Sequence, residues 1–319
     1  MGRITVLFVS DLHYRPDAPK GDPAAALGFQ KLMEIVRSER PDLIVGAGDW
    51  DLGFDKEAFE ELAEVAYVLT IYGNHENREG IYSARNVDGR PILLPEGEVV
   101  EFEGLRLAGI SGNLGSGKRW HHKTPEEFEA EAAEISEEEV DVLITHEPPS
   151  EVPFTPDNPY GKRVVMRSVR MVRPKLHVSG HVEYPTQVVS YEGIKFLHVS
   201  SQPPACEYAV GTFDGEAFRE LKIKRAPVTP LGGGRVSLGP TASLAQRRWP
   251  RGRGPSFDGT AKRVALAALH DVHQTNRAPL AIPYHGAQVY AVLNAEESPH
   301  HPILVANDSA NHAPRPIGA

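Results

Sequence analysis

Short apolar runs alternate with longer segments of helical apolar spacing through the first two thirds of the chain. The runs at 4–10 and 42–46 are almost wholly apolar and are bounded by acidic or glycine-rich segments, which is typical of buried strands. Between them, a segment that begins at Asp22 carries apolar residues at helical spacing. A third run, at 67–71, follows another helical segment at about 56–66. This alternation predicts parallel strands with helices packed on the sheet.

Later β-rich runs come in pairs that are separated by an acidic residue and a glycine. Such pairs predict hairpins at 98–110, 187–199 and 208–223. A capping box at Thr124 opens an acidic helix that leads to the apolar run at 140–145. The combination of βα units and hairpins predicts an α/β fold in which two packed sheets are flanked by helices.

The composition of the chain changes near Ala226. The segment 228–319 contains ten prolines and nine glycines, and carries nine basic against five acidic residues. The rest of the chain carries 25 basic against 38 acidic residues, so this body is acidic. We therefore predict one domain at 1–226 and, at 227–319, a Pro/Gly-rich linker and C-terminal extension of uncertain fold that is partly disordered. The acidic body disfavours nucleic acid as a partner and suits a protein that holds cations.

Several other classes of protein are excluded by simple patterns. No run approaches the roughly 18 apolar residues of a membrane-spanning helix, so we expect no membrane partner. Cys206 is the single cysteine, which excludes a disulfide framework. The N-terminal residues lack the pattern of a signal peptide. These observations predict a cytoplasmic protein, and they leave the oligomeric state open.

Five predicted strands end in loops that carry Asp, His, Asn or Glu. These loops are Asp11-Leu12-His13, Gly48-Asp49, Gly73-Asn74-His75-Glu76, His146-Glu147 and Gly180-His181-Val182-Glu183. One such loop alone is a common turn, but the carboxyl ends of strands are where α/β sheets build their sites. Five of them in order predict a single cluster. Oxygen and imidazole ligands without thiolate suit Mn, Fe, Zn, Ni or Co, and a carboxylate can bridge two ions.

This order of motifs resembles the calcineurin-like metallophosphoesterase family over about residues 3–223. The family pattern is Asp-x-His, Gly-Asp, Gly-Asn-His-Glu or Gly-Asn-His-Asp, a later His, and a terminal Gly-His-x-His. The resemblance implies a four-layer fold, in which a two-sheet sandwich is flanked by helices. It also implies two divalent metal ions, Mn²⁺ being favoured. The enzyme would hydrolyse a phosphodiester or another small phosphorylated compound through a metal-bridging hydroxide.

The resemblance also assigns roles to individual residues. The metal ligands would be Asp11 and His13 at the first ion, Asp49 between both ions, and Asn74, His146 and His181 at the second ion. His75 would be catalytic and would stabilise the transition state or protonate the leaving group.

Two positions depart from the family pattern. Glu183 stands where the family has its last histidine ligand. A glutamate can still bind metal through oxygen, which favours harder ions such as Mn²⁺. Leu52 stands where the family often has an aspartate, and Asp51 precedes it. An orienting role of Asp51 toward His75 stays open.

Phosphate recognition needs cations beside the metals. The candidates are Arg78, after the Gly-Asn-His-Glu loop, and Arg119, His121 and His122 in a basic run. The same run also fits an ordinary solvated loop. The substrate would be a small-molecule or nucleotide-like phosphoester.

Two other functions stay open at this point. A non-catalytic metal- or ligand-binding relative would explain the departure at Glu183. A nuclease would need a basic surface, which the acidic body does not favour.

Overall fold

The computed structural model describes most of the first 227 residues and several short strands beyond them. The described residues are 2–17, 24–116, 118–154, 160–227, 229–231, 235–237, 281–284, 287–292, 303–307 and 315–316. The chain divides into two compact units, Met1–Thr241 and Ala242–Ala319. The disorder expected in the C-terminal extension concerns residues outside the described set. The domain boundary expected near Ala226 stays a prediction.

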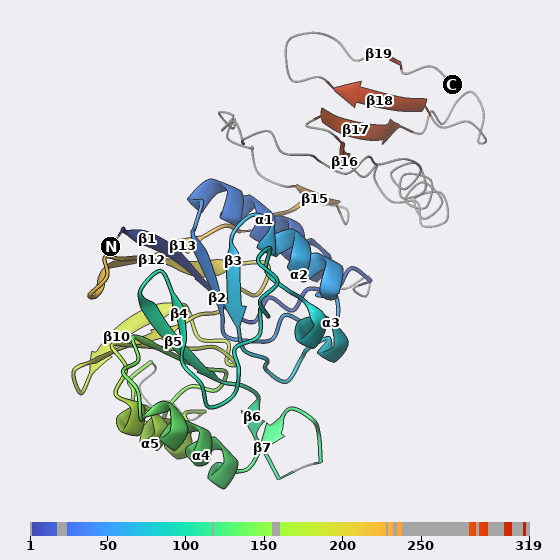
Figure 1. Ribbon diagram of the computed structural model, residues 1–319. Coiled ribbons are helices and arrows are strands. Elements are labelled where there is room, and N and C mark those ends of the chain that lie inside the picture. Colours follow the sequence, from blue (N-terminus) through green and yellow to red (C-terminus); the bar gives the residue numbers. More distant parts are fainter. Residues whose placement is uncertain are drawn as a thin grey trace. The chain divides into compact units, whose positions relative to one another are not determined.

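The first large sheet has five strands in the order β13-β12-β1-β2-β3 (Figure 1). They are β1 (Ile4–Val9), β2 (Leu43–Gly46), β3 (Tyr67–Thr70), β12 (Glu207–Phe213) and β13 (Phe218–Arg225). β1, β2 and β3 are parallel, and β12 pairs with β1 in the antiparallel direction. The carboxyl ends of the three parallel strands therefore lie at one end of this sheet.

The second large sheet has six strands in the order β10-β11-β9-β8-β5-β4. They are β4 (Val100–Phe102), β5 (Leu105–Ile110), β8 (Val142–Thr145), β9 (Leu176–Ser179), β10 (Gln187–Tyr191) and β11 (Ile194–His198). β5, β8, β9 and β11 are parallel neighbours. The expected hairpins are present as β4–β5, β10–β11 and β12–β13. The acidic-Gly turns of the first two have positive φ at both residues, as a two-residue hairpin turn requires.

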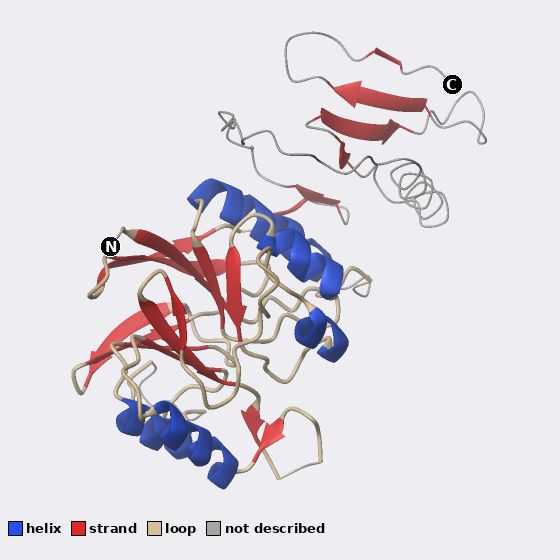
Figure 2. Ribbon diagram, viewed as in Figure 1, coloured by secondary structure: helices blue, strands red, loops and turns tan. Residues whose placement is uncertain are grey.

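Helices cover the outer face of each sheet (Figures 1 and 2). The first sheet carries α1 (Gly28–Glu39), α2 (Lys56–Ala63) and α3 (Arg78–Ser83), and the short η1 (Ala25–Leu27) directly precedes α1. The second sheet carries α4 (Pro125–Ile135) and α5 (Arg163–Val172). The capping box at the start of α4 is formed by Thr124 and Glu127. The described part of the chain thus confirms the helix–sheet–sheet–helix arrangement.

Alternation along β1 explains why its whole sequence is apolar. Val6 and Phe8 belong to the cluster between the two sheets, where they meet residues such as Leu107 and Val142. Leu7 and its alternate neighbours face the helices of the first layer instead. Both faces of the strand are therefore buried, so an uninterrupted apolar run is required.

The remaining described strands are short. Unit one also contains the ribbon β6 (Asn113–Leu114) with β7 (His122–Lys123), and the pair β14 (Thr229–Leu231) with β15 (Arg235–Ser237). Unit two contains a four-stranded sheet, which consists of β16 (Ala281–Tyr284), β17 (Ala287–Val292), β18 (Ile303–Asn307) and β19 (Arg315–Pro316).

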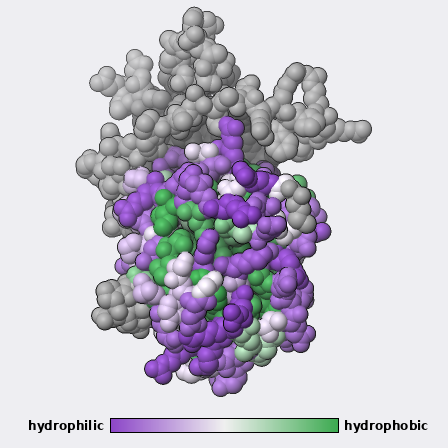
Figure 3. Space-filling view, turned by 90° about the vertical axis from the view of Figure 1, so that its left-hand side faces the viewer, coloured by the Kyte–Doolittle hydropathy of each residue, from purple (hydrophilic) through white to green (hydrophobic). Residues whose placement is uncertain are grey.

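The surface of the described residues is mixed. On the face shown in Figure 3, hydrophilic side chains surround areas where apolar residues are visible. Within the described segments, no helix combines the length and the apolar character that crossing a membrane would need.

Candidate metal centre

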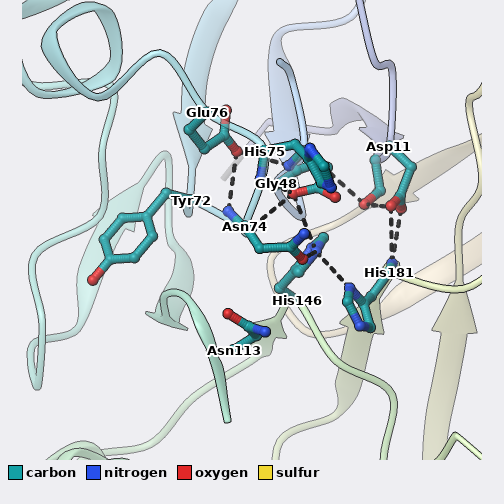
Figure 4. A network of polar contacts seen from close by, with 12 residues as sticks. Asp11, Gly48, Tyr72, Asn74, His75, Glu76, Asn113, His146 and His181 are labelled. Atoms are coloured by element: carbon teal, nitrogen blue, oxygen red, sulfur yellow. Dashed lines mark hydrogen bonds and ion pairs between the residues drawn. The ribbon is translucent and has the colours of Figure 1, made fainter. Parts of the chain in front are cut away.

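The five polar loops meet where the strands of both sheets end. They follow β1, β2 and β3 of the first sheet and β8 and β9 of the second sheet. Figure 4 shows side chains from these loops, including those of Asp11, Asn74, His146 and His181, directed toward one another. The structure therefore brings residues that are up to 170 positions apart into one polar network, as in the bond from the His181 backbone to Asp11.

The backbone of these loops is strained in a way that serves the site. Asp11, His13, Asp49 and His181 all have positive φ, between 45° and 72°. Non-glycine residues in this region cost roughly 1–3 kcal/mol each, and such residues concentrate at functional sites. The strain turns each side chain inward at the end of its strand.

Glu76 holds two of these loops together. Its buried carboxylate accepts hydrogen bonds from the backbone N–H groups of Asp49 (2.7 Å), Trp50 (3.2 Å) and Gly73 (3.0 Å). Burial, and next the charge of Asp49, raise the pKa of Glu76 well above its ordinary value. The last residue of the Gly-Asn-His-Glu motif is thus a structural support for the loop that carries Asp49.

Two glycines in the motifs leave room for side chains of the candidate metal-binding groups. A methyl group on Gly73 would overlap Asp49 Oδ1 and lie 2.7 Å from the ring of His146. A methyl group on Gly180 would overlap Asp11 and Ser10. Real Cβ atoms do not approach other atoms so closely, so these positions need glycine.

Asp49 lies at the centre of the cluster and faces two sides. Its Oδ2 is 3.7 Å from His13 Nε2, and its Oδ1 is 3.3 Å from His146 Nε2. Oδ1 also accepts hydrogen bonds from the backbone N–H groups of Asn74 (2.7 Å) and His75 (2.8 Å), which fix the carboxylate. One carboxylate between two imidazoles is the geometry that a bridging metal ligand requires.

Three groups of side chains can each hold a metal ion. They are Asp11, His13 and Asp49; Asp49, His146 and His181; and His13, Asp51 and His75, each with ligand atoms within 4.8 Å of one another. The first two groups share Asp49. Asn74 joins the second group, because its Oδ1 lies 3.2 Å from His146 Nε2.

The ring of His146 tests whether the second group fits a cation. His146 Nδ1 lies 2.7 Å from Ala47 O, a carbonyl that can only accept, so Nδ1 carries the hydrogen. In the neutral ring, Nε2 then presents a lone pair, 3.0 Å from His181 Nδ1 and near the oxygen of Asn74. When His181 carries its hydrogen on Nε2, its Nδ1 presents a lone pair too, and the three lone pairs converge on a position that suits a cation. The donor set therefore fits a divalent metal ion.

Burial and neighbouring charges shift the pKa values of three residues in the cluster. Burial lowers the pKa of His146, but Asp49, Asp11 and the Ala47 carbonyl together raise it to about 10. Burial, and next the charge of His146, lower the pKa of His181 to about 4. Burial raises the pKa of Asp11 to about 6, partly offset by His146. A metal ion that binds at Nε2 of His146 would displace any proton held there.

Asp51 has a role that the motif comparison did not assign. Its Oδ2 lies 3.3 Å from His13 Nδ1 and accepts a 2.8 Å hydrogen bond from Arg15 Nε. Because a carboxylate only accepts, Asp51 keeps the hydrogen of His13 on Nδ1 and leaves Nε2 for the metal side. Among the described contacts, the side chain of Asp51 holds His13 rather than His75. Its position two residues after Asp49 is the sequence signal.

Glu147 was also missed as a supporting residue. It is buried, accepts a hydrogen bond from the backbone N–H of Leu114 (2.7 Å), and pairs with Lys162 Nζ at 3.3 Å. Its Oε1 lies 4.0 Å from His181 Nε2, on the side of the ring that faces away from His146. Glu147 therefore links the ribbon β6–β7 to the metal centre, and its place directly after His146 is its only sequence signal.

Glu183 lies apart from the three groups. It is exposed and lines a pocket of about 390 Å³ together with Asp11, His13 and His181. Arg15, Ser200 and Gln202 also line this pocket. The structure therefore places Glu183 beside the first group of ligands without placing it in that group.

His75 lies beside the cluster, and three of the expected substrate residues lie in and next to the ribbon β6–β7. The His75 ring is exposed and stands 5.2 Å from the His13 ring, edge to face. His121 is buried and its Nδ1 is 2.8 Å from Asn113 Oδ1. His122 packs edge to face on His121 at 4.6 Å. Arg119 is exposed and contributes its backbone carbonyl to a turn with His122.

The fold and the site define a two-sheet α/β protein in which two candidate metal-binding groups share the carboxylate of Asp49. The chain belongs to the calcineurin-like phosphoesterase family, whose model matches residues 4–184. Proteins of this family are dinuclear and metal-dependent, which agrees with two ligand groups that share Asp49. No protein with a curated description matches the sequence.

Three solved structures align with this chain at low sequence identity, and the one with a TM-score above 0.5 shows the same fold. One crystal structure aligns at 15% identity with a TM-score of 0.54, over 70% of this chain and 99% of that chain. TT1561 of Thermus thermophilus aligns at 15% identity with a TM-score of 0.49, over 70% and 98% of the two chains. GAP50, the anchor in the inner membrane complex of Plasmodium, aligns at 13% identity with a TM-score of 0.45, over 78% and 90%.

Proposed function

We propose that this protein is a dinuclear, metal-dependent phosphoesterase that acts on a phosphodiester or another small phosphorylated compound. The observation that carries the proposal is the position of Asp49, with one oxygen toward His13 and the other toward His146. Asp11 and His13 would hold one ion, and Asn74, His146 and His181 the other. When bound, two such ions supply positive charge at the phosphoryl oxygens and a nucleophilic water at neutral pH.

The protein's own residues would orient the reaction. Asp51 and the Ala47 carbonyl keep the rings of His13 and His146 with Nε2 toward the centre. His75 is exposed beside the cluster, and its ring makes no side-chain hydrogen bond among the described residues, so it is available to the leaving group. There it would donate a proton to the departing alcohol oxygen, a contribution of roughly 10²–10⁴-fold in rate.

Glu183 bears on the choice of metal. Its carboxylate lines the pocket beside Asp11 and His13, and we assign it as an oxygen ligand on that side. An oxygen in place of an imidazole favours harder ions, so Mn²⁺ is the proposed metal, ahead of Fe, Zn, Ni or Co. A small or nucleotide-like substrate is preferred to nucleic acid, because the body is acidic.

The test is metal-dependent hydrolysis of bis-p-nitrophenyl phosphate after metal removal and addition of Mn²⁺. Asp49→Asn keeps the shape of the side chain but removes the charge between the two ligand groups. We expect this variant to lose at least about 100-fold in kcat and most of its bound metal. Asp88→Asn removes a half-exposed carboxylate that pairs with Arg90, and it should match the wild type. Equal turnover in wild type and Asp49→Asn would contradict the proposal.

A further inference from the structure

Arg78 is an arginine without a carboxylate partner beside the metal centre. It begins α3, three residues after His75, and its side chain is exposed. Among the described residues, no carboxylate lies within ion-pair distance of Arg78, whereas Arg15 and Arg167 each pair with one. A cation held in place but left unpaired is available to an anionic ligand.

Two aromatic rings hold the guanidinium of Arg78. Its Cζ lies 5.4 Å from the centre of the Trp120 ring and 5.9 Å from the centre of the Tyr82 ring. Contact with a ring face uses the plane of the guanidinium and leaves the in-plane N–H groups free. Those groups match the two oxygens of a carboxylate or phosphate in a bidentate contact. Tyr82 is 46% exposed, so this platform is open to solvent.

The platform is anchored to the loops that build the metal centre. The Trp120 ring lies 5.0 Å from the ring of Tyr72, which directly precedes the Gly73-Asn74-His75 loop. On its other side, Trp120 contacts His121 at 5.7 Å, and His121 bonds to Asn113 of β6. β6 is tied to the centre through the bond from the Leu114 backbone to Glu147. The position of Arg78 is therefore set by the same structure that positions the metal ligands.

We propose that Arg78, supported by Trp120 and Tyr82, binds a second oxyanion on the leaving alcohol of the substrate. This inference rests on the proposed function, because it places the leaving alcohol on the His75 side. The substrate class is then a phosphoester whose alcohol carries a further carboxylate or phosphate. Specificity for this class resides in α3 and in the ribbon β6–β7, not in the metal ligands.

The experiment compares substrates that differ only in a charge on the leaving alcohol. The probes are diphenyl phosphate, phenyl 4-carboxyphenyl phosphate and phenyl 4-phosphonophenyl phosphate, each with the Mn²⁺-loaded full chain. Arg78→Gln should lower kcat/KM for the two charged probes about 10- to 100-fold relative to diphenyl phosphate. The charged probe with the larger loss of kcat/KM in Arg78→Gln carries the preferred oxyanion. Arg167→Gln removes an exposed arginine on α5 and should leave all ratios unchanged.

The aromatic support is tested separately. Trp120→Leu should lower the preference for the charged probes a few-fold, mainly through KM, while Trp120→Phe keeps a ring face and most of the preference. Equal losses for charged and uncharged probes in Arg78→Gln, with Trp120→Leu behaving like Trp120→Phe, would overturn the assignment.

A binding measurement separates this proposal from the proposed function. Calorimetric titration of the metal-free full chain with 4-hydroxybenzoate, against phenol, reports the anion site without turnover. Binding of 4-hydroxybenzoate that Arg78→Gln abolishes, in a wild type that hydrolyses none of the probes, would support the anion site and contradict the phosphoesterase. Hydrolysis of diphenyl phosphate with no anion preference in either measurement would contradict the anion site alone.

Discussion

Individual side chains at this centre are oriented by partners that do not touch the metal side. Asp51 and the Ala47 carbonyl each hold the Nδ1–H of a histidine, and Glu147 stands behind His181. Such partners determine which nitrogen faces the metal, so they matter nearly as much as the ligands. At the residue scale, the chemistry therefore depends on loop residues adjacent to the motifs.

His75 provides a prediction about the reaction itself. His75→Ala should lower kcat for diphenyl phosphate, whose phenol leaves poorly as an anion, roughly 10²- to 10⁴-fold, because the leaving oxygen loses its proton donor. Metal content, measured by elemental analysis, should stay that of the wild type. The same variant should lose less kcat on bis-p-nitrophenyl phosphate, because p-nitrophenolate leaves without a proton. A variant that loses its metal instead would show that His75 is a ligand.

His177 provides a prediction about pH and stability. Burial lowers the pKa of His177 to about 3. Below about pH 6.5 the ring is therefore neutral in the folded state but protonated in the unfolded chain. The stability contributed by the neutral ring is complete above that pH and falls as the pH drops toward 3, by up to about 1.4 kcal/mol per pH unit. His177→Gln retains a partner for Thr145, which His177 contacts at 2.9 Å, but cannot titrate.

The measurement is urea unfolding of the metal-free proteins between neutral pH and about pH 5. Loss of stability with falling pH should be less steep in His177→Gln than in wild type, whatever the absolute stability of the variant. Comparison of slopes cancels the titration of the metal ligands, which both proteins share. Parallel slopes would show that His177 is protonated in the folded state.

At the scale of elements, the start of α4 tests how local sequence stabilises the second layer. The Thr124 side chain accepts a hydrogen bond from the Glu127 backbone, and the Glu127 carboxylate bonds back to the Thr124 N–H. Thr124→Ala should lower the free energy of unfolding by about 1 kcal/mol, since it leaves a helix N–H without a partner. Ser136→Ala, at the other end of α4, is the matched control. Equal effects in urea unfolding would contradict a specific capping contribution.

At the scale of the whole molecule, the core clusters define which part of the chain can fold alone. The unit Met1–Thr241 contains both large sheets and the buried clusters that hold them together. A chain that ends at Thr241 should therefore unfold cooperatively, with a free energy of unfolding within about 0.5 kcal/mol of the full chain. It should keep metal-dependent hydrolysis. A shortened chain that is unfolded or unable to bind metal would show that the second unit contributes to the core.

The sequence by itself determined the layers and the main ligands of this protein. Apolar runs with both faces buried predicted β1 and β8, and acidic-Gly turns predicted the hairpins, because these signals act between neighbours in the chain. Polar residues at strand ends predicted one cluster, since parallel strands deliver their loops to the same place.

Only the tertiary structure decided which side chains support those ligands. Glu147 contacts Leu114 and His181, and Arg78 contacts Trp120. These partners are more than 30 positions apart in the sequence, so no local sequence pattern predicts the contacts. The sequence around Arg78 predicts a solvated helix residue, and the sequence around Trp120 predicts a loop residue of the basic run. They become one platform because Trp120 packs against the first layer, where its ring centre lies 5.4 Å from Arg78 Cζ. Contacts of this kind arise from packing between layers, and the periodicity of the sequence does not predict them.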